Sequence, residues 1–82
     1  MNLNKCFLMG NLTRDPELKY TPHGTAMCKF TIAVNETFVK DGEKKKNTQF
    51  FNIVVWGKAG ENCGKYLAKG KPVLIEGRLL LS

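Results

Sequence analysis

The sequence predicts a mainly β domain, a small Greek-key antiparallel barrel with one short helix between its third and fourth long strands. Three observations predict it. Apolar and polar residues alternate in the middle of the chain, only one segment has helical spacing, and the connections between the early strands are too short for parallel crossovers. The 82 residues leave room for one domain, spanning residues 1–82.

The first strand is expected from Asn4 to Leu12. Four consecutive apolar residues, 6–9, precede Gly10, which is typical of a strand buried on both faces and then bent. The outer of these faces could be covered within one subunit or by a neighbouring copy, and the sequence leaves both open. A short hairpin follows over residues 15–20, with its turn at Pro22 to Gly24.

The next strand has the clearest pattern. The apolar residues 28, 30, 32 and 34 alternate with residues 29, 31, 33 and 35, as in a half-buried strand. The segment from Lys40 to Thr48 contains Asp-Gly and three consecutive lysines, so we expect a loop or an extended hairpin tip there. It leads into an antiparallel strand from Gln49 to Trp56.

After Trp56 the spacing of apolar residues changes from two residues to three or four. Apolar residues at 59, 63, 66 and 67 predict a short amphipathic helix between Gly57 and Gly70, although Gly60 and Gly64 weaken it. A final strand is expected from Val73 to Leu81. Such a barrel normally has five strands, so the last strand of this one is expected to be missing.

The charge of the chain favours a polyanionic partner. Lysine and arginine exceed aspartate and glutamate by six, and the isoelectric point is near 9.4. Nucleic acid is the first candidate and an anionic membrane surface the second. No apolar run approaches the roughly 20 residues of a membrane-spanning helix, and the N-terminus lacks the basic-then-apolar order of a signal peptide, so we expect a cytoplasmic protein.

The sequence offers little for catalysis or for metal binding. Cys6, Cys28 and Cys63 lie in apolar patterns without a CxxC pair, so we expect free structural thiols. The one histidine, His23, lies in a Pro-Gly turn, and no serine or cysteine has a base in an interpretable motif. We therefore expect a protein that is not an enzyme and that has no metal and no cofactor.

Aromatic residues close to the basic segment suggest a surface for unpaired nucleic acid. Phe38, Phe50 and Trp56 lie on or beside the two strands that this segment joins. Flat rings can stack on any base, and lysines can neutralise phosphates. An ordinary explanation exists for both features, because aromatic residues in strands usually belong to a core and lysine-rich turns are usually only solvated.

Five segments resemble bacterial-type single-stranded DNA-binding proteins (SSB), in that family's order and approximate spacing over essentially the whole chain. No single segment is specific for the family, but five segments in the same order and spacing are. The segments are Asn4-Lys5 to Gly10-Asn11-Leu12, Asp15-Pro16-Glu17 with Tyr20 and Gly24, Phe50 to Gly57-Lys58, Tyr66 to Gly70, and Ile75-Glu76-Gly77. The resemblance implies an OB-fold domain that binds single-stranded DNA of any nucleotide sequence and protects it in DNA replication, recombination and repair.

The resemblance also implies roles for particular residues. Phe38, Phe50 and Trp56 match base-stacking aromatics of the family, and three lysines fall on its basic positions. Candidate phosphate contacts also come from the lysine run itself, which could equally be a solvated loop. The expected DNA-binding residues are Phe38, Phe50, Trp56, Lys5, Lys44, Lys45, Lys46, Lys58 and Lys69.

Strand periodicity predicts which rings are free to stack. Phe50 and Trp56 share one face of their strand with residues 52 and 54, whereas residues 51, 53 and 55 form a wholly apolar opposite face. We therefore expect the two rings to point outward. Phe38 shares parity with the apolar Ile32 and Val34, so a bulge would be needed to turn it outward.

Family members continue beyond Ile75-Glu76-Gly77 into another hairpin, a closing strand and a flexible tail with an acidic tip that recruits protein partners. None of this is in the sequence, so we expect a C-terminally truncated barrel with unpaired edges. The resemblance implies a homo-oligomer, a homotetramer in the family. Two alternatives stay open: an oligomerisation or interaction module with weak DNA binding, and an RNA-binding or replication-restart OB-fold protein.

Overall fold

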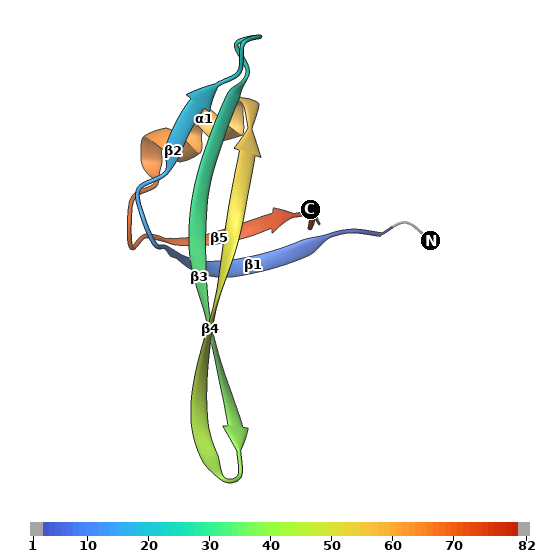
Figure 1. Ribbon diagram of the computed structural model, residues 1–82, viewed down its shortest axis with the longest axis vertical. Helices are drawn as coiled ribbons and strands as arrows, with labels where there is room; N and C mark the ends of the chain where they lie inside the picture. Colours follow the sequence, from blue (N-terminus) through green and yellow to red (C-terminus); the bar gives the residue numbers. More distant parts are fainter. Residues whose placement is uncertain (1–2, 81–82) are drawn as a thin grey trace.

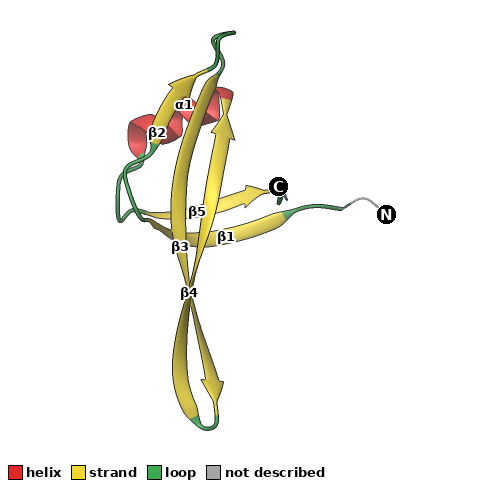
Figure 2. Ribbon diagram, viewed as in Figure 1, coloured by secondary structure: helices red, strands yellow, loops and turns green. Residues whose placement is uncertain are grey.

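The computed structural model describes residues 3–80, which form five strands and one helix (Figure 1). All strand pairs are antiparallel. Strands and loops make up most of the chain (Figure 2). The predicted mainly β architecture with a single helix before the last strand is confirmed. The elements are β1 (Cys6–Leu12), β2 (Glu17–Tyr20), β3 (Ala26–Lys40), β4 (Glu43–Trp56), α1 (Gly57–Tyr66) and β5 (Pro72–Gly77).

Strand β3 organises the sheet because it pairs with three other strands. It pairs with β4 along one edge, and along the other edge it pairs with β2 near its start and with β1 near its middle. Strand β5 pairs with β1. Within residues 3–80, β4 and β5 form no ladder with each other, and a cavity of about 640 Å³ lies between them. The curled sheet is therefore open along this seam.

The core lies on the inner side of β3. Phe30 and Ile32 are buried there with Cys28, and Leu12 of β1 joins them. Burial of each large apolar side chain stabilises the fold by about 1.5 to 3 kcal/mol. Partly buried apolar side chains surround this centre: Leu8, Val34, Phe51, Ile53, Val55, Cys63, Leu67, Val73 and Ile75.

The hairpin of β3 and β4 is longer than the sequence predicts. Of the two expectations for Lys40 to Thr48, the extended hairpin tip is confirmed and the loop is wrong, because the two strands stay paired until Lys40 faces Glu43. Only Asp41 and Gly42 form the turn, and both have positive φ, of 53° and 79°. An Asp-Gly pair suits this two-residue turn, whose twist matches that of the strands. Because both faces of the outer hairpin are exposed, it has no apolar alternation to mark it as a strand.

The other predicted boundaries differ by a few residues. Strand β1 begins at Cys6, not at Asn4, and β5 ends at Gly77, before the expected Leu81, which lies outside the described residues. Helix α1 ends at Tyr66, not near Gly70, because Leu67 is already extended. The buried Gly60 lets α1 approach β4, since a Cβ atom there would overlap the carbonyl oxygen of Val55.

Strand β1 is apolar on both sides, but only one side packs against the core, so the expected burial of both faces is not found within one chain. Leu8 packs against the core, whereas Phe7 and Met9 point outward and are 64% and 67% exposed. On β5, Leu74 lies opposite Met9 and is 68% exposed. The outer side of this strand pair is therefore an exposed apolar face.

Candidate nucleic-acid interface

Two exposed rings lie on one face of β4. Phe50 is 66% exposed and Trp56 is 55% exposed, and both occupy even positions of the same regular strand. Their separation of six positions corresponds to about 20 Å along a strand. This side of β3 and β4 is called the outer face below.

The opposite face of β4 covers the core. Phe51, Ile53 and Val55 are partly buried and pack against the buried cluster. The prediction that these three point inward while Phe50 and Trp56 point outward is confirmed. Bases could therefore approach both rings without disturbing the core.

Phe38 lies elsewhere. The ladder between β3 and β4 runs without interruption from the Met27–Trp56 pair to the Lys40–Glu43 pair, so no bulge turns Phe38 toward the outer face. It shares the side of Lys45, opposite to that of Phe50. Phe38 is nevertheless 43% exposed, because the hairpin at this point extends beyond the core. Its ring is accessible, but on the other side of the ladder.

The three consecutive lysines are strand residues and are all exposed. Strand alternation divides them: Lys44 and Lys46 lie on the outer face with Phe50, whereas Lys45 lies on the side of Phe38. Within residues 3–80 none of the three forms an ion pair. Two of them can therefore contribute positive charge on the side of the exposed rings.

The remaining predicted lysines are dispersed. Lys5 forms an ion pair with Glu76 at 2.6 Å beside the exposed apolar face. Lys58, the second residue of α1, is 3.9 Å from Glu61 and highly exposed. Lys69 lies in the α1–β5 connection and donates its backbone N–H to a carboxylate of the β1–β2 loop. Of these three lysines, Lys58 lies two positions after Trp56, a ring of the outer face.

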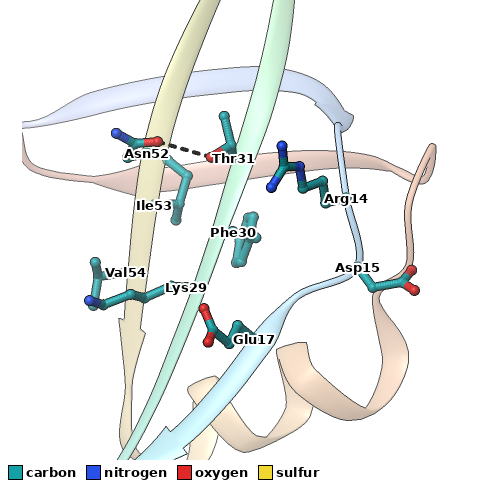
Figure 3. A pocket seen from close by; sticks show the side chains of 9 residues that line it. All are labelled: Arg14, Asp15, Glu17, Lys29, Phe30, Thr31, Asn52, Ile53 and Val54. Atoms are coloured by element: carbon teal, nitrogen blue, oxygen red, sulfur yellow. Dashed lines mark hydrogen bonds between the residues drawn. The ribbon is translucent and has the colours of Figure 1, made fainter.

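A hollow of about 400 Å³ lies on the sheet between the positions of the two rings (Figure 3). None of its polar residues is among the DNA-binding residues expected from the sequence. A usable signal existed for one of them, because Asn52 shares the parity of Phe50 and Trp56. The others depend on the register of the sheet. The hollow is lined by Arg14, Asp15, Glu17, Lys29, Phe30, Thr31, Asn52, Ile53 and Val54.

The thiols lie apart from the outer face. Cys28 is fully buried, and burial raises the pKa of its thiol, with a smaller contribution from Cys63 nearby. Burial likewise raises the pKa of Cys63, which packs against the core. Raised pKa values keep both groups as neutral, weakly reactive thiols. No three His, Cys, Asp or Glu side chains in the described part of the chain are grouped as metal ligands would be.

Among residues 3–80, the single helix α1 has ten residues and is neither long nor apolar enough to cross a membrane.

Comparison with known proteins gives one consistent result. The model of the single-strand binding protein family matches residues 3–82. The chain is 49% identical over 78 residues to single-stranded DNA-binding protein 2 of Clostridium acetobutylicum, covering 94% of this chain and 57% of that protein. It is 47% identical over 77 residues to the single-stranded DNA-binding protein of Halalkalibacterium halodurans, and the match covers 94% of this chain and 45% of that protein. The chain thus spans about half the length of these relatives.

A solved structure has the same fold. The crystal structure of a deletion mutant of the single-stranded DNA binding protein from Thermus aquaticus superposes with a TM-score of 0.87. The two are 32% identical, and the match covers 93% of this chain and 38% of that chain. The predicted OB-fold class and the family resemblance of the sequence are therefore confirmed.

Proposed function

The chain belongs to the single-strand binding protein family, and from this premise we propose that it binds single-stranded DNA without reading its sequence. Bases stack on Phe50 and Trp56, and lysines on the same side of β4 neutralise phosphates. The activity is binding without catalysis, and its setting is DNA replication, recombination and repair in the bacterial cytoplasm. This setting is what the family resemblance implies.

The exposure of Phe50 and Trp56 is the observation that carries the proposal. A strand aromatic left more than half exposed keeps roughly 100 Å² in water, which forgoes about 2.5 kcal/mol of hydrophobic stabilisation per ring. A stacked base covers such a ring and is worth about 1 to 3 kcal/mol. The regular alternation of β4 points both rings to one side, which suits a single strand that runs along the sheet.

Fluorescence provides the test. Trp56 is the only tryptophan, so its emission reports directly on stacking. We expect oligo-dT at low salt to quench this emission, and the affinity to fall as salt rises because counterions are released. Phe50→Ala keeps the fluorophore and removes the other ring, so it should bind more weakly with quenching retained at saturation.

The same titration separates the alternatives. Absence of both quenching and salt-sensitive binding would contradict the proposal and favour an interaction module. Tighter binding of oligo-U than of oligo-dT would favour an RNA-binding protein, since a preference for RNA requires contacts to the 2′-hydroxyl.

We also propose that the chain forms a homo-oligomer, and family resemblance suggests a homotetramer. The exposed apolar face of Phe7, Met9 and Leu74 supports this, because contiguous apolar patches commonly mark protein contacts. Met9→Lys should reduce the mass measured by light scattering. Val39→Lys is a matched control, since Val39 is 68% exposed on the distant hairpin, and its mass should equal that of the unmodified chain. An unchanged mass of the Met9 variant would contradict the assignment of this face.

A further inference from the structure

The hollow between the two rings lies on the path that a bound strand must follow. Its floor comes from Lys29 and Thr31 of β3 and from Asn52 and Val54 of β4, which pair across the ladder. The rings are about 20 Å apart along β4, whereas successive stacked bases are separated by only about 3.4 Å. A strand that engages both rings therefore places at least one nucleotide over the hollow.

Hydrogen-bond donors dominate the hollow. Thr31 donates its hydroxyl to Asn52 Oδ1 at 2.9 Å, which orients the amide so that its nitrogen points away from Thr31 (Figure 3). Within residues 3–80 no group accepts from that nitrogen, and neither Arg14 nor Lys29 forms an ion pair. The Arg14 guanidinium extends from the β1–β2 loop toward Thr31. These donors are available to a ligand.

The two carboxylates at the hollow are already engaged. Glu17 pairs with Lys19 at 3.1 Å. Asp15 accepts the backbone N–H of Lys69 at 2.8 Å, and its carboxylate is turned away from Arg14. The unengaged polar groups are thus mostly donors, and two of them are cations. A phosphodiester suits this environment because its charged oxygens only accept hydrogen bonds.

We propose that the hollow binds the phosphodiester of a nucleotide lying between the bases stacked on Phe50 and Trp56. Arg14 is its principal ligand, and the Asn52 amide is a second donor. Thr31 is a positioning residue, because it fixes the orientation of that amide. This inference rests on the proposed function, since it concerns the same DNA strand.

Arg14→Gln tests the principal ligand. It should weaken oligo-dT binding about tenfold at low salt, the effect of one hydrogen bond to a charged group. It should also make the plot of log affinity against log salt shallower by about 0.7, the value for one phosphate contact of a single strand. Trp56 quenching at saturation should be unchanged. Arg14→Lys should restore the salt dependence, because it retains the charge.

A matched charge control separates this contact from the general field of the protein. Lys65→Gln removes the same charge from α1, where Lys65 lies over the ring of Tyr66. It should leave the salt dependence nearly unchanged. Equal slopes and affinities for the Arg14 and Lys65 variants would overturn the inference.

Asn52→Asp tests the second donor with an unusually close control. Thr48 donates to Asn35 Oδ1 at 2.8 Å on the same outer face, but this pair lies beyond Phe50 and outside the hollow. Asn52→Asp should weaken binding several-fold more than Asn35→Asp, because only the former places a carboxylate against the phosphate. Equal losses would overturn the assignment of Asn52. If the unmodified chain binds no DNA, the proposed function fails as well. If the unmodified chain binds DNA and the Arg14 and Asn52 variants bind it with the same affinity, this inference alone is overturned.

Discussion

Phe38 lies directly opposite Lys45 on the β3–β4 ladder, on the side that faces away from the rings of Phe50 and Trp56. The strand that carries these two rings is regular along its whole length, so the sides cannot exchange without breaking the register. We therefore expect Phe50 and Trp56 to contribute more to DNA binding than Phe38.

Alanine substitutions should follow that ranking. Phe50→Ala should weaken binding of a short oligo-dT by about 1 to 3 kcal/mol, the value for one stacked base. Phe38→Ala should cost less, because a short strand along the outer face does not reach its ring. Fluorescence titration of Trp56 measures both. Equal losses would mean that the strand wraps around the edge of the hairpin.

The lysine run should act unequally. Lys44 and Lys46 share the outer face, so removing both charges should make the salt dependence of log affinity shallower by about 1.4, at roughly 0.7 per phosphate. Lys45→Gln should change it little. Titrations at several salt concentrations give these slopes directly. A Lys45 effect as large as that of either neighbour would show that side-chain direction does not select the contacts.

Gly60 should be intolerant of a side chain. Gly60→Ala would force a methyl group against the carbonyl oxygen of Val55, and overpacking of this kind costs about 1 to 3 kcal/mol. Urea denaturation measures the loss. Gly77→Ala is the control, since a Cβ atom there meets nothing within 4 Å. If both variants unfold at the same urea concentration, α1 is not held as closely to β4 as described.

Stability should fall in alkali. Burial raises the thiol pKa of Cys28 and Cys63 in the folded chain above the ordinary value of 9.0. Above about that pH the unfolded chain loses its thiol protons first, so the free energy of unfolding decreases as pH rises, whereas below it these thiols contribute no pH dependence. Thermal unfolding between pH 7 and 10 should show a shallower decrease for Cys28→Ala. If Cys28→Ala and the unmodified chain lose stability equally as pH rises, other titratable groups cause the loss.

Much of this fold can be predicted from the sequence because its inner strands are half buried. Alternation from Cys28 to Val34, and from Phe50 to Trp56, arises where one face meets the core and the other meets water. The outer hairpin lacks that contrast, so the run from Lys40 to Thr48 resembles a loop although backbone pairing continues through it. Hydrogen bonds that join two solvated strands leave little trace in composition.

The candidate site was predictable only where it follows one strand. Parity along β4 was sufficient to place Phe50 and Trp56 together. The hollow between them required the register of β3 against β4 and the path of the β1–β2 loop, which brings Arg14 to Thr31. Contacts between separate elements of this kind depend on the curled geometry of the whole sheet.

The uninterrupted pairing of β3 and β4 restricts how this hairpin can change in length. A single inserted or deleted residue between Phe50 and Trp56 would send one ring into the interior and bring a core side chain out. Matched additions to both strands near Asp41 and Gly42 would instead lengthen the arm without altering anything behind it. Insertions in relatives should therefore concentrate at the tip and occur in equal numbers on its two sides.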